Sequence, residues 1–158
     1  MKPKQEVTAE ERIHRCIDLL RIRKIRITQA RRAIIGTLCK CTVPLSVHEI
    51  FDKVSAVITT DISTVYRFTN HLLDNELLKA MPHPRLDIPG YVMHLPGETE
   101  DYVACTDCGS VEWIENLAEL KKIEQELMQK LHFKATSHEL RLTGVCEPCQ
   151  KSNSEPEV

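Results

Sequence analysis

The chain has 158 residues, of which 42% are hydrophobic and 28% are charged, and its formal net charge at pH 7 is −2. This composition is that of a globular protein and excludes an extensively disordered or fibrous chain. No apolar stretch approaches the roughly 20 residues of a membrane-spanning helix, and the polar residues 1–12 lack the apolar core of a signal peptide. We therefore expect a cytoplasmic protein that does not associate with membranes.

The small net charge hides an uneven distribution. Residues 1–89 carry 15 Lys and Arg against 10 Asp and Glu, whereas residues 90–158 carry 6 against 13. A basic half joined to an acidic half predicts two domains with different partners. We place the first domain at residues 1–89, the second at residues 90–150 and a flexible polar tail at residues 151–158.

Hydrophobic periodicity and capping residues predict four helices in the first domain. They are expected at Ala9 to Lys24, at Gln29 to Leu38, after the N-cap Ser46, and from Asp61 or Ser63 onward. Two strand-like segments, Lys79 to Met81 and Tyr91 to Leu95, flank a turn-rich stretch. Four helices followed by a long hairpin indicate a winged helix-turn-helix domain.

The second domain changes to a mixed pattern. Strands are predicted at Tyr102 to Cys105, Ser110 to Ile114 and Glu139 to Val145, and a helix at Leu117 to Leu131. This order describes a small α/β unit, so the whole chain is expected to have an α+β fold.

Two CxxC pairs predict a metal site in the second domain. Cys105 and Cys108 form the first pair, and Cys146 and Cys149 form the second. Four thiolates suit tetrahedral zinc, which would cross-link a domain of about 60 residues. The alternatives are two disulfides, four buried thiols, a rubredoxin-like iron site or a redox-active pair. The remaining cysteines, Cys16, Cys39 and Cys41, lack paired spacing and are interpreted as core residues.

Basic residues gather in the first helices, as contact with nucleic-acid phosphates requires. In a helix-turn-helix the second helix enters the major groove of double-stranded DNA with its N-terminal residues near base edges. Here these residues include Thr64, Tyr66 and Arg67, and an arginine can donate two hydrogen bonds to guanine. The competing interpretations are a solvated basic face and, for Tyr66, packing in the core.

The chain resembles the ferric uptake regulator family. The matching motifs are Arg26-Ile-Thr28-Gln-Ala-Arg31-Arg32, Asp61-Ile-Ser-Thr64-Val-Tyr66-Arg67, the CxxCG at 105–109, and His138-Glu-Leu-Arg-Leu-Thr-Gly144-Val-Cys146-Glu-Pro-Cys149. The resemblance implies a bacterial metal-responsive regulator, usually a repressor, that binds AT-rich palindromes as a homodimer through a winged helix and a C-terminal dimerisation domain. It also implies a minor-groove contact for Arg26, major-groove contacts for Tyr66 and Arg67, and structural zinc at the four cysteines. Thr28, Arg31 and Thr64 belong to the same motifs and complete the expected DNA-binding set.

The sensing site departs from the family pattern. Pro44 stands where members commonly have a histidine, and residues 98–102 replace their histidine-rich loop. One interpretation keeps an altered sensor at the domain hinge, with His83, His94, Glu98 and Glu100 as ligands of zinc, iron, manganese or nickel. A second possible cluster consists of Asp101, Glu119 and His138. The other interpretation is a lost sensor, with DNA binding that is constitutive or under redox control.

The sequence leaves two other classes of protein as alternatives to a regulator. A zinc-stapled module that contacts only protein would show no salt-dependent DNA binding, and an iron-containing redox protein would be coloured. An enzyme is not expected, because the sequence shows no nucleophile–base arrangement, phosphate loop or paired catalytic carboxylates.

Overall fold

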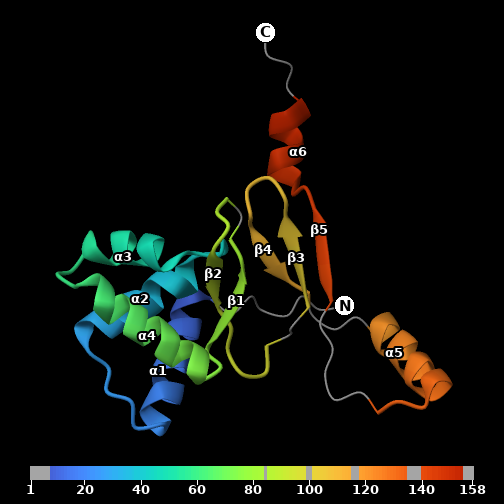
Figure 1. Cartoon of the computed structure of the whole chain (residues 1–158), viewed down its shortest axis with the longest axis horizontal. Coiled ribbons are helices and arrows are strands. Elements are labelled where there is room, and N and C mark those ends of the chain that lie inside the picture. Colours follow the sequence, from blue (N-terminus) through green and yellow to red (C-terminus); the bar gives the residue numbers. More distant parts are fainter. Residues whose placement is uncertain (1–7, 84, 99–100, 115–117, 135–139, 155–158) are drawn as a thin grey trace. The chain divides into compact units, whose positions relative to one another are not determined.

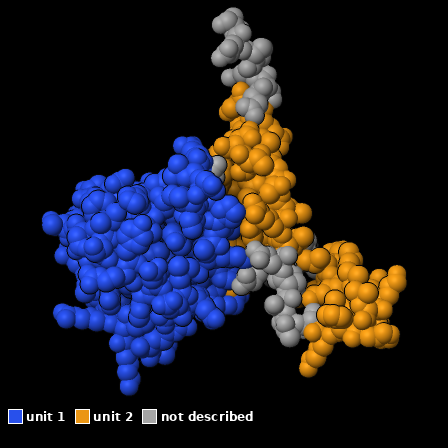
Figure 2. Space-filling view, in the orientation of Figure 1, with its two compact units in different colours: residues 1–97 blue, residues 98–158 orange. Residues whose placement is uncertain are grey.

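A computed structural model describes residues 8–83, 85–98, 101–114, 118–134 and 140–154. The chain divides into two compact units, Met1–Gly97 and Glu98–Val158 (Figure 2). In the part of the chain that is described, no helix is long and apolar enough to cross a membrane.

The described residues of the first unit form four helices and a two-stranded antiparallel sheet (Figure 1). The elements are α1 (Ala9–Ile22), α2 (Gln29–Lys40), α3 (Val47–Ser55), α4 (Ile62–Asp74), β1 (Leu78–Pro82) and β2 (Pro89–Met93). Side chains of Thr8, Thr28, Ser46 and Asp61 cap the four helices by accepting hydrogen bonds from backbone N–H groups. Each of these N-terminal caps fixes where its helix begins, and the arrangement is the predicted winged helix-turn-helix.

The strands β1 and β2 and the loop between them form the wing. The apolar faces of the four helices and of these two strands share one core. Its largest fully buried side chain is Phe68 of α4, and Leu20, Ile34, Ile50 and Leu77 lie in the same cluster. Because one side of every helix faces this cluster, the opposite sides of the helices remain for contact with solvent or a partner.

The first unit extends beyond the predicted boundary at residues 89 and 90, which is therefore corrected to Gly97. β2 pairs with β1 along its whole length, from Leu78 opposite Met93 to Pro82 opposite Pro89. In addition, Arg12 donates a hydrogen bond to the Met93 carbonyl at 2.8 Å, and Arg15 donates one to the Pro96 carbonyl. These bonds attach the segment after β2 to α1.

Gly90 permits a close approach between the wing and the segment before α3. A Cβ atom at this position would lie 2.6 Å from the Cβ of Pro44, which is well inside van der Waals contact. Leu45 and Tyr91 exchange two backbone hydrogen bonds beside this contact, at 3.1 and 2.8 Å. Pro44 and Gly90 therefore act as a packed pair that holds the wing against the helices.

The second unit is built around a three-stranded sheet of order β4-β3-β5 (Figure 1). Its elements are β3 (Tyr102–Cys105), β4 (Val111–Trp113), α5 (Ala118–Leu131), β5 (Arg141–Gly144) and α6 (Glu147–Ser154). β4 is antiparallel and β5 parallel to the central β3. A parallel pair needs a crossover connection, and the segment between β4 and β5 that contains α5 supplies it.

The structure describes the first four residues of the expected tail, residues 151–158. Residues 151–154 continue α6, and residues 155–158 lie outside the described residues. Pro148 is in the first turn, where its missing N–H costs no helical hydrogen bond. Lys151 forms an ion pair with Glu147 one turn earlier, at 2.5 Å. The tail prediction rested on polarity alone, which does not exclude a short exposed helix.

Candidate metal centre and nucleic-acid interface

The four paired cysteines come together in the second unit. One sulfur atom from each of Cys105, Cys108, Cys146 and Cys149 lies within 4.8 Å of the other three. The Sγ atoms of Cys108 and Cys146 are 3.7 Å apart. Zinc–sulfur bonds of about 2.3 Å in a tetrahedron place neighbouring sulfurs about 3.8 Å apart. The cluster thus has the size of a Zn(Cys)4 site, and all four cysteines are free of disulfide bonds.

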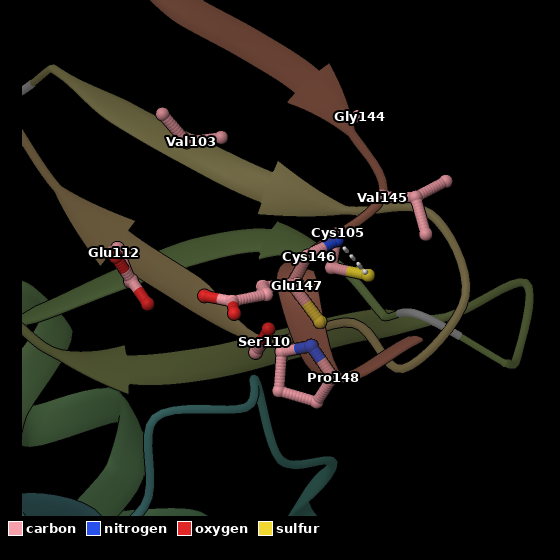
Figure 3. Close-up of a pocket in the computed structure, with 9 residues that line it drawn as sticks. All are labelled: Val103, Cys105, Ser110, Glu112, Gly144, Val145, Cys146, Glu147 and Pro148. Carbon is pink, nitrogen blue, oxygen red and sulfur yellow. Dashed lines mark hydrogen bonds between the residues drawn. The ribbon is translucent and has the colours of Figure 1, made fainter. Parts of the chain in front are cut away.

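The backbone explains how the two pairs meet (Figure 3). Cys105 ends β3 opposite Gly144 of the parallel strand β5, so the turns after both strands lie at the same end of the sheet. The first turn passes through Gly109, whose φ of +76° is unfavourable for other residues. Its N–H donates to the Cys105 carbonyl at 3.0 Å. In the second turn the N–H of Cys146 donates to the Cys105 sulfur at 3.3 Å.

The surroundings of three of these thiols shift their pKa values, two downward and one upward. N–H groups of Cys108 and Cys146 lower the pKa of Cys105 to about 6. Hydrogen bonds with the hydroxyl and N–H groups of Ser110 lower the pKa of Cys108. Hydrogen bonding to Cys146, burial and the neighbouring thiols raise the pKa of Cys149 to about 12. Four adjacent thiolates repel one another, and a divalent cation at their centre removes that repulsion, so the donor set fits zinc.

A cavity of about 390 Å³ opens beside the cluster (Figure 3). Cys105 and Cys146 form part of its wall, and Glu112, Glu147 and Val103 are among the other lining residues. Two carboxylates at its edge attract cations. The cavity therefore places two acidic side chains, Glu112 and Glu147, beside the cysteine cluster.

The other three cysteines lie in the first unit. Cys16 and Cys39 are buried and Cys41 is half-buried. Burial, followed by an electrostatic interaction with the neighbouring Cys39, raises the pKa of Cys16 to about 12. The Cys16 thiol therefore stays protonated near neutral pH and is a poor nucleophile.

α4 presents the expected base-reading residues to solvent. The Asp61 carboxylate accepts from the Thr64 N–H at 2.8 Å and from the Thr64 hydroxyl at 2.7 Å, which fixes the start of the helix. Tyr66 is 45% exposed, with its ring edge-on to His48 of α3 at 6.2 Å. The exposed Arg67 donates from Nε to the Ser63 carbonyl at 3.3 Å, which leaves its terminal N–H groups available to a ligand.

The loop before α2 carries the remaining basic candidates. Arg26 is exposed, and the Thr28 hydroxyl caps α2 by accepting from the Arg31 N–H at 3.3 Å. The Arg31 guanidinium donates to the Arg26 carbonyl at 2.7 Å and lies over the Phe68 ring, 5.0 Å from its centroid. Arg31 thus links the loop that carries Arg26 to the core beneath α4.

The structure describes three of the four predicted sensor residues, His83 and His94 in the first unit and Glu98 in the second. His83 is buried and bonded to Glu49, while His94 and Glu98 are half-buried. Glu100 lies outside the described residues, as does His138 of the second possible cluster. Within the described ranges the four cysteines are the only group of three or more metal-binding side chains.

Glu49 is the residue that sequence reasoning missed. Its carboxylate accepts hydrogen bonds from both the N–H and the hydroxyl of Ser46 and from His83, each at 2.8 Å. The Ser46-x-x-Glu49 spacing is a capping-box signal that predicts the contact with Ser46. The bond to His83 joins residues 34 positions apart, and no local pattern predicts it.

Comparisons with known proteins agree with this architecture. The model of the ferric uptake regulator family matches residues 23–143. A ferric uptake regulation protein of Campylobacter upsaliensis is 26% identical over 135 residues, which are 83% of this chain and 84% of that protein.

Solved structures show the same fold at low identity. The Helicobacter pylori ferric uptake regulator is 23% identical with a TM-score of 0.67, over 93% of this chain and 97% of that one. A zinc uptake regulator complexed with zinc and DNA is 20% identical with a TM-score of 0.66, over 94% of this chain and 99% of that one.

Proposed function

The chain belongs to the ferric uptake regulator family of metal-responsive, DNA-binding transcriptional regulators, which are not enzymes, and we propose that it is a cytoplasmic repressor acting as a homodimer on palindromic AT-rich operators. The observation that carries the proposal is the exposed N-terminal part of α4, where Tyr66 and Arg67 face away from the core. In a helix-turn-helix this part of the second helix lies against base edges. Arg26 and Thr28 before α2, together with Thr64, complete the proposed DNA contacts.

A homodimer is supported by the apolar surface of the second unit. In α5, Ile123, Leu127 and Leu131 are 45–57% exposed, and Phe133 after it is 73% exposed. β5 is an edge strand of the sheet, and all four of its residues are exposed. An apolar helix face and an open strand edge are surfaces that a second copy of the chain can cover.

Two kinds of metal are proposed for this regulator. Zinc held by the four cysteines folds the second unit. A second, exchangeable divalent ion (zinc, iron, manganese or nickel) regulates DNA binding, with His94, Glu98 and Glu100 as its proposed ligands. An imidazole with carboxylates is a suitable donor set for each of these ions. Binding of the ion raises DNA affinity by favouring one arrangement of the two winged-helix domains of the proposed dimer.

The salt dependence of DNA binding tests the DNA-binding part of this proposal. The protein with its divalent metal is expected to select palindromic sequences from a random duplex library. Its affinity for a selected duplex should fall steeply between 50 and 200 mM salt, because several phosphates are neutralised at once. Fluorescence anisotropy at four salt concentrations measures the slope. A protein that selects no duplex and shows no salt dependence would instead be an interaction module.

A further inference from the structure

His83, which directly follows β1, has no ring nitrogen left for a metal ion in this structure. Its side chain is 3% exposed. The Nε2 atom lies 2.8 Å from a carboxylate oxygen of Glu49. The Nδ1 atom lies 3.2 Å from the N–H nitrogen of Arg85 and 3.1 Å from that of Leu86. A metal ion would need one of these two nitrogens with a free lone pair.

The two backbone contacts fix the tautomer of the ring. A backbone N–H can only donate, so Nδ1 must be the acceptor and carries no proton. The proton of the neutral imidazole is therefore on Nε2, where it is donated to the Glu49 carboxylate. Both nitrogens are satisfied by the protein itself, which is the arrangement of a structural histidine.

These bonds connect the wing to the start of α3. Glu49 also accepts the two hydrogen bonds from Ser46 that form the N-terminal cap of α3. On the wing side, the backbone N–H of His83 donates to the Ile88 carbonyl at 3.1 Å and closes the loop. A single buried ring thus holds the wing loop from the inside and anchors it to a helix cap.

The residues that this loop presents are suited to DNA. Arg85 is exposed and can contact a phosphate or a narrow minor groove. Leu86 and Ile88 are 50% and 44% exposed at the same tip, although solvent exposure of large apolar groups is unfavourable. Hydrogen bonds that hold Arg85 and Leu86 in place before binding reduce the entropy that is lost when these residues contact DNA.

We infer that His83 is a positioning residue that presets the wing for DNA contact, and that it is not a ligand of the regulatory metal. The inference rests on the proposed function, since it assigns the wing a role in that same DNA contact. The other part of the inference, that both ring nitrogens of His83 are hydrogen-bonded within the protein and bind no metal, does not depend on DNA binding.

Two substitutions distinguish the hydrogen bonds made by Nδ1 from the hydrogen bond made by Nε2. In His83→Asn the amide oxygen occupies the place of Nδ1 and can accept from the following N–H groups, as in an Asx-turn. In His83→Gln the amide nitrogen occupies the place of Nε2 and can donate to Glu49, but the loop loses its acceptor. Both variants lack the imidazole that a metal site would require.

DNA affinity and its salt dependence are measured for both variants and for the wild type, each with and without Mn²⁺ or Zn²⁺. We expect His83→Gln to bind the selected duplex about fivefold or more weakly, from the loss of two hydrogen bonds of about 0.5–1.5 kcal/mol each. Its salt slope should fall by about 1, because one phosphate contact is lost. His83→Asn should stay within about threefold of the wild type. The ratio of affinities with and without metal should be unchanged in both.

Loss of the metal response in both variants would overturn the inference, as would equal effects of the two variants on affinity. ¹⁵N correlation spectra of the imidazole provide a test without DNA. We expect an unprotonated Nδ1 and a protonated Nε2 that do not shift when Zn²⁺ is added. A shift of either nitrogen to a metal-bound position would contradict the assignment. If the wild type binds no DNA, the proposed function fails, and the spectra still decide the role of the ring.

Discussion

Replacing Cys146 by serine is expected to remove zinc from the four-cysteine cluster and to unfold the second unit. The Cys146 sulfur lies 3.7 Å from that of Cys108 and is one of the four sulfur donors of the cluster. Structural zinc sites have apparent binding free energies of about 10–16 kcal/mol, and a unit of this size has little other means of stabilisation. Zinc content by mass spectrometry and thermal unfolding by circular dichroism measure both effects.

Cys41→Ser is the matched control for this experiment. Cys41 is half-buried in the first unit and does not belong to the cluster. It should keep one zinc per chain and both units folded. A Cys146→Ser variant that retains one zinc per chain and unfolds like the wild type would contradict the assignment of the site.

Arg67→Ala is expected to weaken binding to the selected operator by about 5- to 150-fold. This range corresponds to about 1–3 kcal/mol for a bidentate contact between arginine and guanine. Affinity for unrelated duplex DNA should fall much less, because a base contact carries sequence information and a phosphate contact does not. Anisotropy titrations with a selected and a scrambled duplex measure the two losses.

Arg21→Ala is the matched control, because it also removes one positive charge but lies away from the proposed DNA contact. Arg21 pairs with Asp18 near the end of α1, and the neighbouring Arg23 is bonded to Asn75 at the C-terminal end of α4. That end is about 18 Å from the first turn of the 13-residue α4. This variant should bind both duplexes almost as the wild type does. Equal losses for Arg67→Ala and Arg21→Ala would show that only net charge matters.

The fold was predictable wherever local signals coincide. The four helices of the first unit begin at or next to the predicted residues, because each start carries a side-chain cap followed by apolar residues at helical spacing. α6 was not predicted, since its residues are polar and exposed and leave no apolar pattern. The unit boundary was placed too early because β2 belongs to the first unit through its pairing with β1, which composition does not reveal.

The site residues, too, were predictable only where a local sequence pattern specifies them. The four cysteines were found because two CxxC pairs carry their chemistry in their spacing, and the parallel pairing of β3 with β5 brings them together. The bonds of His83 were not predictable, because they depend on Glu49 in another element. Pro44, which replaces an expected histidine, is buried against Gly90.

Control of DNA binding by metal is tested most directly by counting the metal ions bound to the protein while measuring its DNA affinity. Metal content per chain and affinity for a selected duplex are measured on the same samples before and after mild chelation. We predict one zinc per chain that survives chelation, and a second divalent ion whose removal lowers DNA affinity and whose return restores it. One zinc per chain with unchanged DNA affinity, before and after chelation and after added metal, would contradict the claim and indicate a regulator that has lost its sensor.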